Sequence, residues 1–326
     1  MTPTPVAALA TPKASPVLAF FVGVLLCALV GCGAVPEAVQ PPSDFVPTPL
    51  PGEGGAQLQA LQRAERVAPL RYRVIVVPGS GCAGMGAFAD RYFAGLLHAQ
   101  VLVLHKPGVD PWARTAPADC SAAWVQQDRH THWLAQARAA LRADAQQRQG
   151  APAVPQLLVG ISEGAELLPA LAPEVPQLAG LVLLSASGLD PQEAGALQAR
   201  RLGVAGDWTA LGQRVAGAAP DSTVVQGRSL GYWRDLWRWR MSDALIAGPW
   251  PLLQVFGTAD ALVPPSAYAR FAERARERTA PWCARALPGA DHGLQGPAGD
   301  GVQALWRWLE DAARVPQPGG CLPLGR

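Results

Sequence analysis

The stretch LLVGISEGAELL, from Leu157 to Leu168, decides the fold class. It begins as a continuous apolar run, which is typical of a buried β-strand, and continues with Ala, Glu and Leu, which favour a helix. Between the two stands the pentapeptide Gly160-Ile161-Ser162-Glu163-Gly164. A sharp strand-to-helix turn there would expose Ser162, and Gly160 and Gly164 would relieve crowding around a strained backbone. The pentapeptide alone also suits a tight glycine turn in any α/β protein, so the rest of the chain must distinguish the two.

Strand-like and helix-like segments alternate on both sides of this stretch. Further apolar runs predict strands at Tyr72–Val77, Val101–Leu104, Leu181–Leu184, Leu252–Phe256 and Ala284–Leu287. Helices are predicted at Trp133–Gln147, Glu163–Leu171 and Val302–Arg314. Continuous apolar strands that alternate with helices indicate an α/β fold, in which helices flank both faces of a mostly parallel central sheet.

Composition indicates a globular protein and limits the classes of function. Of 326 residues 49% are hydrophobic, which supplies a full core and excludes a disordered or fibrous protein. The formal net charge is only +2, and no basic block is interleaved with aromatic residues, so we expect no nucleic-acid partner. No cysteine or histidine spacing suggests a metal site. We expect no cofactor, and the oligomeric state is left open.

One long segment interrupts the alternation of strands and helices. About sixty residues, 188–248, separate two predicted strands, which is more than a crossover helix needs. Leu230, Trp233 and Trp237 fall on one helical face within it. We expect this segment to form a helical lid over the site, with its tryptophans packed on the core.

Two later loops carry residue types that a nucleophilic serine needs. The segment GTADALVP, Gly257–Pro264, follows the strand Leu252–Phe256, and LPGADHG, Leu287–Gly293, follows the last predicted strand. A serine hydroxyl is a weak nucleophile until a base takes its proton and a carboxylate orients that base. Both loops lie at carboxyl ends of strands, where open α/β sheets place their sites.

In the order serine, acid, histidine, these motifs resemble the α/β-hydrolase superfamily over Tyr72–Leu309. The resemblance implies a serine hydrolase in which the pentapeptide is the nucleophile elbow and Ser162 is the nucleophile. It implies His292 as the base and Asp260 as the orienting acid. Asp291 also stands beside His292, but adjacent side chains usually diverge, so Asp260 is the better candidate.

The same resemblance implies an oxyanion hole built from two backbone amides. One belongs to Glu163, the residue after the nucleophile, and the other to Ser80 or Gly81 in the loop after the first strand. Pro78 stands where members of the superfamily often carry His, which should not matter if backbone amides do the work. The side chain of Glu163 either points away from the hole or binds a cationic group, and the sequence leaves both open.

The first residues of the chain indicate export. An apolar run, Val17–Val30, follows Lys13; it is short for a membrane span of about 20 residues but suits a secretory signal. The run ends in Leu29-Val30-Gly31-Cys32, which resembles the lipobox of bacterial lipoproteins. That resemblance implies a signal peptide over 1–31, lipidation of Cys32, and a lipid anchor in the cell envelope, at the periplasmic side of the outer membrane. A cleaved signal that releases a secreted periplasmic protein is the alternative.

A segment rich in Pro and Gly, residues 32–55, follows the lipobox. Its composition favours a semi-rigid tether between the lipid and the folded part of the chain. The α/β domain, including the lid, is then expected to occupy residues 56–326.

Four cysteines remain after the lipobox: Cys82, Cys120, Cys283 and Cys321. In an oxidising compartment they allow three pairings. We expect Cys82–Cys120 and Cys283–Cys321, because each pair closes a local loop or ties down the tail. Four buried free thiols are the alternative, and they would suit a cytosolic protein.

These observations predict a serine hydrolase that cleaves a carboxylic ester or related acyl bond of a small substrate through an acyl-enzyme. A serine peptidase of aminopeptidase type is an alternative, suggested by Glu163 and Glu166 near the nucleophile. Arginines of the lid suggest an anionic acyl substrate, although a solvated helix face is the favoured interpretation of them: Arg228, Arg234, Arg238 and Arg240. A catalytically silent envelope lipoprotein, which would bind a partner through the Trp-rich lid, is a third possibility.

Overall fold

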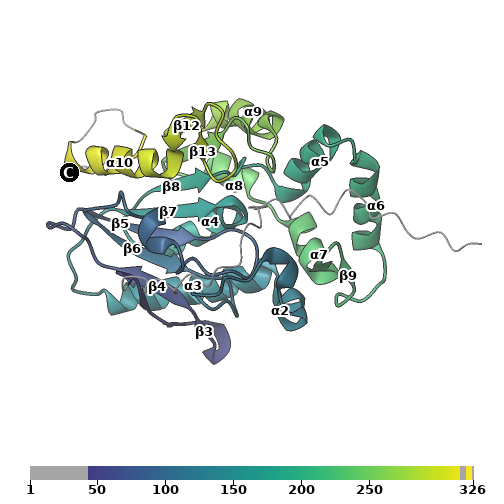
Figure 1. The fold of residues 1–326 in the computed structure, drawn as a ribbon, viewed down its shortest axis with the longest axis horizontal. Coiled ribbons are helices and arrows are strands. Elements are labelled where there is room, and N and C mark those ends of the chain that lie inside the picture. The colour runs from purple at the N-terminus through teal and green to yellow at the C-terminus, as the bar shows by residue number, and fades with distance from the viewer. Residues whose placement is uncertain (1–42, 316–320, 325–326) are drawn as a thin grey trace, which may run out of the picture.

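An eight-stranded sheet forms the centre of the molecule (Figure 1). The structure, a computed structural model, describes residues 43–315 and 321–324. The strand order is β1-β4-β6-β5-β7-β8-β11-β12. The strands are β1 (Val46–Pro47), β4 (Ala60–Arg63), β5 (Tyr72–Val77), β6 (Ala99–Leu104), β7 (Gln156–Ile161), β8 (Leu178–Leu184), β11 (Leu252–Gly257) and β12 (Trp282–Leu287). All pairs from β6 to β12 are parallel, whereas β4 pairs antiparallel with both β1 and β6, so the predicted α/β fold is confirmed.

Alternate side chains of the strands enter two separate cores. All six residues of β5 are buried, and successive side chains of a strand point to opposite faces. Val74 and Val76 pack in one core with Trp306, whereas Ile75 packs in the other with Trp133. Burial on both faces is the reason that the strands read as continuous apolar runs.

Helices cover both faces of the sheet, and Figure 1 shows α10 and α3 on opposite sides of it. They are α1 (Ala89–Tyr92), α2 (Ala122–Gln127), α3 (His130–Gln147), α4 (Leu168–Leu171), α9 (Pro265–Arg274) and α10 (Gly301–Arg314). Short 3-10 turns are η2 (Glu53–Gly55), η3 (Pro117–Asp119), η5 (Ala172–Glu174) and η6 (Ala275–Glu277). Two small ribbons pair β2 (Leu50–Pro51) with β3 (Gln57–Leu58) and β13 (Gln295–Gly296) with β14 (Gly299–Asp300). Within the described ranges, none of the helices has the length and apolar character that a membrane span requires.

The segment between β8 and β11 folds as a mainly helical insertion, and we keep the name lid for residues 188–248. Its elements are α5 (Pro191–Arg201), α6 (Ala205–Ala216), β9 (Val224–Val225), β10 (Arg228–Ser229), α7 (Leu230–Arg238) and α8 (Ser242–Ala247). Leu230 and Trp233 of α7 are buried in a small core that α6 shares, with Leu211 and Val215. Figure 1 shows α5, α6 and α7 gathered beyond one end of the sheet.

The helix predicted at Glu163–Leu171 is not continuous. A 3-10 turn, η4 (Ser162–Leu167), comes first, and only the following four residues, α4, are α-helical. Pro169 explains the break, because proline lacks the N–H that an α-helix would need at that position and fits only a first helical turn.

The folded region begins before Ala56, so the predicted tether over 32–55 is wrong for its described part. Strand β1 pairs with β4, and β2 pairs with β3. Phe45 and Leu50 are 2% and 1% exposed. The prolines of this segment suggested a tether, but these two apolar side chains between them are taken up by the core. The predicted signal peptide, 1–31, and Cys32 lie outside the described residues.

Two disulfides join Cys82 to Cys120 and Cys283 to Cys321, as predicted. The Cα atoms are 5.8 Å apart in each pair, which is ordinary disulfide geometry. The second bond anchors the tail, where Leu322 is buried in the same core as Trp306. The four cysteines are therefore not free thiols.

Candidate active site

Ser162 stands at the sharp turn between β7 and η4. Its φ angle is +51°, a left-handed conformation that is costly for a residue with a side chain. A Cβ at Gly160 would lie 2.3 Å from the Cα of Ala165, and one at Gly164 would lie 2.2 Å from the Pro78 carbonyl oxygen. Only glycine fits at these two positions, so the turn has the tight geometry predicted for the pentapeptide.

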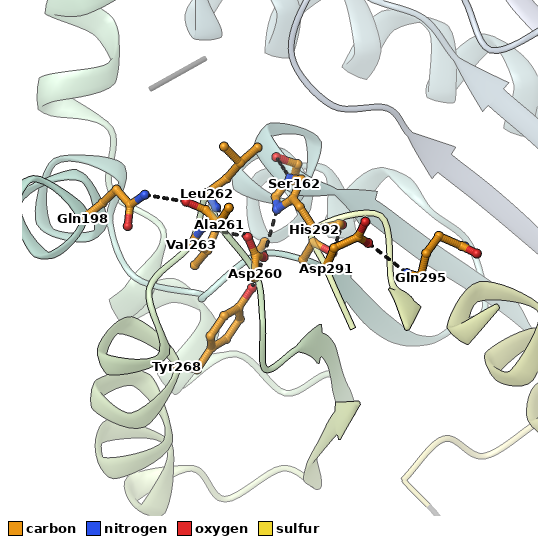
Figure 2. A network of polar contacts seen from close by, with 12 residues as sticks. Ser162, Gln198, Asp260, Ala261, Leu262, Val263, Tyr268, Asp291, His292 and Gln295 are labelled. Atoms are coloured by element: carbon orange, nitrogen blue, oxygen red, sulfur yellow. Dashed lines mark hydrogen bonds and ion pairs between the residues drawn. The ribbon is translucent and has the colours of Figure 1, made fainter. Parts of the chain in front are cut away.

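The three predicted side chains lie together at the carboxyl ends of β7, β11 and β12. Nε2 of His292 is 3.0 Å from Oγ of Ser162. Nδ1 of the same ring is 2.9 Å from Oδ2 of Asp260. Figure 2 shows the imidazole between the serine and the carboxylate, so one ring contacts both partners at hydrogen-bond distance. A base positioned in this way can take the proton of the serine hydroxyl.

Asp260 is buried and fully hydrogen-bonded. Its Oδ1 accepts the backbone N–H groups of Leu262 and Val263, at 2.7 and 3.0 Å, and the Tyr268 hydroxyl donates to Oδ2 at 3.3 Å. Burial alone would raise the pKa of Asp260, but the hydrogen bond and charge of His292 and the two backbone N–H groups lower it. This carboxylate therefore stays ionised and holds the imidazole in one orientation.

Asp291, the other acid beside the histidine, is hydrogen-bonded within its own loop. Its Oδ1 accepts the backbone N–H of Gln295 at 2.9 Å, and Figure 2 shows its side chain directed toward Gln295. The structure therefore places Asp260, and not Asp291, against the ring of His292.

Backbone contacts fix the two loops that carry His292 and Asp260. The Ser185 hydroxyl donates to the carbonyl of His292 at 2.6 Å. The N–H of Ala259 donates to the carbonyl of Ala290 at 2.9 Å, so the acid loop and the histidine loop are bonded to each other. A Cβ at Gly257 would lie 2.0 Å from the Ala290 carbonyl oxygen, so this close approach depends on glycine.

The loop predicted to complete the oxyanion hole passes beside the nucleophile. A Cβ built on Gly79 would lie 3.4 Å from the Cβ of Ser162. Gly79 and Ser80 line the cavity above Ser162, whereas Gly81 is not among the lining residues. This placement favours Ser80 over Gly81 as the partner of Glu163, and the role of both amides stays a prediction.

Ser162 and His292 open into a cavity of about 460 Å³. Most of its wall is apolar. The sheet side supplies Met85, Phe88, Tyr92, Leu262, Val263 and Leu294, and the lid supplies Leu189, Trp208, Trp233, Leu236 and Met241. The length of the segment between two strands predicted a lid over the site, and Trp208 and Trp233 of this segment form part of the wall.

A buried ionic cluster lies behind the nucleophile, and sequence reasoning missed it. The ammonium of Lys106 is 3.0 Å from Oε2 of Glu163 and 2.9 Å from Oδ1 of Asp128. Arg228, from the lid, binds the other oxygen of Asp128. The Glu163 side chain is therefore paired with a cation of the protein itself.

The arginines of the lid do not line the cavity. Arg228 is 7% exposed and pairs with Asp128, Arg234 pairs with Asp221, and Arg240 pairs with Asp190. Arg238 is exposed and is not among the lining residues. These positions do not support an anionic acyl substrate.

Comparison of the sequence with known protein families finds no match, and comparison with curated proteins finds none. Solved structures are similar in fold. An esterase domain of a Rhodothermus marinus protein is 18% identical and has a TM-score of 0.51, over 83% of this chain and 99% of that one. Carboxyl esterase 2 of the fungus Tuber melanosporum is 16% identical, with a TM-score of 0.56 over 83% and 89%. A puromycin-hydrolyzing peptidase of Mycobacterium tuberculosis is 18% identical, with a TM-score of 0.51 over 83% of this chain and 39% of that one.

Proposed function

We propose that this chain, which has the α/β-hydrolase fold, is a serine hydrolase that cleaves carboxylic esters through an acyl-enzyme. One observation carries the proposal. Asp260, His292 and Ser162 form a continuous hydrogen-bonded series that ends at a serine hydroxyl beside an apolar cavity. Structures of esterases with the same fold support the assignment.

The mechanism follows from the contacts of the three side chains. Nε2 of His292 takes the proton of Ser162 as Oγ attacks the ester carbonyl, and Asp260 stabilises the imidazolium that forms. The negative oxygen of the tetrahedral intermediate is bound by the amides of Glu163 and Ser80. The intermediate collapses, the C–O bond to the alcohol breaks, and His292 returns the proton to the departing alcohol. A water molecule, deprotonated by His292, then attacks the carbonyl of the acyl-enzyme, and the bond to Ser162 breaks to release the acid.

The cavity wall supports one class of substrate. An apolar lining favours an uncharged acyl or alcohol group, because burial of apolar surface is favourable and burial of an unpaired charge is not. A volume of about 460 Å³ suits a substrate of small-molecule size. We therefore propose esters with aliphatic or aromatic groups of moderate size.

A peptidase is the second candidate, because Glu163 and Glu166 both line the cavity and a peptidase is among the similar structures. However, Glu163 is paired with Lys106, and Glu166 lies 2.5 Å from Nε2 of His130. Both carboxylates have partners within the protein, which favours an ester over a substrate with a free amino group. Relative rates on aminoacyl amides and acyl esters separate the two.

The proposed location is the cell envelope, with a lipid anchor at Cys32. Two disulfides support export, since such bonds persist in oxidising compartments. Metabolic labelling with a clickable fatty acid, in the full chain and in a Cys32→Ala variant, tests the anchor.

The test of the enzymatic proposal is Ser162→Ala. We expect this variant to lose hydrolysis of p-nitrophenyl butyrate and labelling by a fluorophosphonate probe. Ser266, an exposed serine of α9, gives a matched control, and Ser266→Ala is expected to behave as the parent chain. Full activity of Ser162→Ala, or failure of the parent chain to hydrolyse any ester or amide and to react with the probe, overturns the proposal.

A further inference from the structure

The residue that follows the nucleophile is a glutamate whose side chain lines the same cavity. Glu163 follows Ser162 directly, its amide is the expected donor to the oxyanion, and its carboxylate is buried at 7% exposure. Negative charge develops on the substrate oxygen as the serine attacks. A bare carboxylate beside the cavity would oppose that charge, and its burial limits screening by solvent.

Lys106 is the group that compensates Glu163. Its Nζ lies 3.0 Å from Oε2 of Glu163, and its side chain is 3% exposed. The ammonium lies over the Trp133 ring, 4.5 Å from the centroid, an arrangement that stabilises a cation away from water. Lys106 comes two residues after β6, the strand on the far side of β5 from β7, so the fold brings it under the elbow.

The remaining charged groups around Glu163 have closer partners of their own, although Nε2 of His130 also lies 3.8 Å from Oε1 of Glu163. Arg228 binds Asp128, and His130 binds Glu166. Groups that face or influence Glu163 are Lys106, His130 and Arg228 on the cationic side, and Asp128, Glu166 and Tyr232 on the acidic side. If Lys106 is removed, Asp128 keeps Arg228, whereas Glu163 loses its closest cation.

The pKa of Glu163 agrees with this geometry. Burial alone would raise it, but the charges of Lys106, His130 and Arg228 and the hydrogen bond from Lys106 lower it to about 2. The carboxylate is therefore ionised at all working pH values, and its charge is always present beside the site.

We propose that Lys106 is a positioning residue that neutralises Glu163, so that the oxyanion can form on the neighbouring amide without repulsion from the carboxylate. The inference rests on the proposed serine-hydrolase function. It assigns to one buried lysine, outside the triad and outside the cavity lining, an effect on the transition state that acts through Glu163.

Lys106→Met tests the proposal, since methionine keeps much of the apolar stem and removes the ammonium, with its charge and its hydrogen bonds to Glu163 and Asp128. We expect kcat for p-nitrophenyl butyrate to fall about 10²-fold, comparable with the loss of one oxyanion donor, while KM changes little. Arg142→Met is the matched control: Arg142 is 58% exposed on α3, and its variant should keep the parent activity. Thermal unfolding of each variant checks that the fold is intact.

The double variant Lys106→Met/Glu163→Gln distinguishes compensation of charge from simple support of the fold. Removal of both charges eliminates the repulsion, so we expect the double variant to regain at least about tenfold in kcat over Lys106→Met. Glu163→Gln alone is expected to lose less activity than Lys106→Met, although both break the same ion pair. If the ion pair only supported the fold, the two single variants would be equally impaired and the double variant would not recover.

The pH dependence gives a second measurement. In Lys106→Met the pKa of Glu163 rises, so the ratio of its kcat to that of the double variant should fall as pH increases and the carboxylate ionises. Parent activity in Lys106→Met, or a ratio independent of pH with no recovery in the double variant, overturns the inference. A parent chain that hydrolyses no substrate and does not react with fluorophosphonate refutes the proposed function instead.

Discussion

Replacement of Asp260 by Asn exchanges one oxygen of the carboxylate for an NH₂ group, and the structure determines which one. Oδ1 accepts two backbone N–H groups, from Leu262 and Val263, and an NH₂ group cannot accept them. The amide oxygen must therefore take the place of Oδ1, and the NH₂ group takes the place of Oδ2, 2.9 Å from Nδ1 of His292. It then donates to Nδ1, which forces the ring proton onto Nε2, toward Ser162. An imidazole in that tautomer cannot accept the serine proton.

The expected loss is about 10⁴-fold in kcat, the size of the effect when an orienting aspartate of this kind becomes asparagine. A loss of this size corresponds to about 5 kcal/mol of activation free energy. KM should change little, because Asp260 is at 1% exposure and does not line the cavity. Steady-state kinetics on p-nitrophenyl butyrate measures both constants, and circular dichroism during heating measures the stability of the variant.

Asp291→Asn is the matched control, since it makes the same chemical change at the residue next to His292. Its Oδ1 accepts the N–H of Gln295, which an asparagine oxygen can also do, so we expect activity within about threefold of the parent. If a folded Asp260→Asn protein keeps more than a tenth of the parent kcat, or if Asp291→Asn shows the large loss, the assignment of the orienting acid is wrong.

Two further predictions concern stability. Asp144→Ala should lower the free energy of unfolding by about 3–5 kcal/mol in urea, because it leaves the guanidinium of Arg73, at 1% exposure, without its two bonds of 2.6 and 2.7 Å. Asp311→Ala, which breaks an exposed pair with Arg314, should change it by less than about 1 kcal/mol, and equal losses would contradict this ranking. Glu163 has a pKa of about 2 in the folded protein and about 4.3 in an unfolded chain. Its ionised carboxylate therefore stabilises the fold fully above about pH 4.3, and this contribution is lost as the pH falls through about 2. Urea unfolding between pH 5 and pH 2 should therefore depend less on pH in Glu163→Gln than in the parent, and parallel curves would count against the ion pair.

Much of the fold and the three residues of the site could be predicted because the relevant signals are local. A strand buried on both faces must be apolar at every position, as in Tyr72–Val77, and this run is visible in any short window. Parallel strands bring their carboxyl ends to one edge, so loops after separate strands converge without any knowledge of the intervening chain. These signals, together with the resemblance to the α/β-hydrolase superfamily, identified Ser162, Asp260 and His292 as candidates.

The ionic cluster could not be predicted, because its members come from four distant parts of the chain. Lys106 and Asp128 are ordinary charged residues in sequence, and nothing local distinguishes a buried pair from an exposed one. In sequence, Arg228 suggests a different role, in binding an anionic substrate, whereas in the structure it pairs with Asp128. Pairing of buried charges is a property of tertiary structure, and no periodicity encodes it.

The same contacts decide how the lid behaves. Arg228 crosses from the lid to the buried Asp128, and the Trp239 indole donates to the carbonyl of Glu166, at 2.8 Å, directly behind the nucleophile. Detachment of the whole lid would break the ion pair and leave a buried carboxylate with one cation fewer, which costs several kcal/mol. The lid is therefore anchored through Arg228 and Trp239 to the same buried cluster that holds Glu163. The proposed compensation of Glu163 and the attachment of the lid then share one set of buried charges.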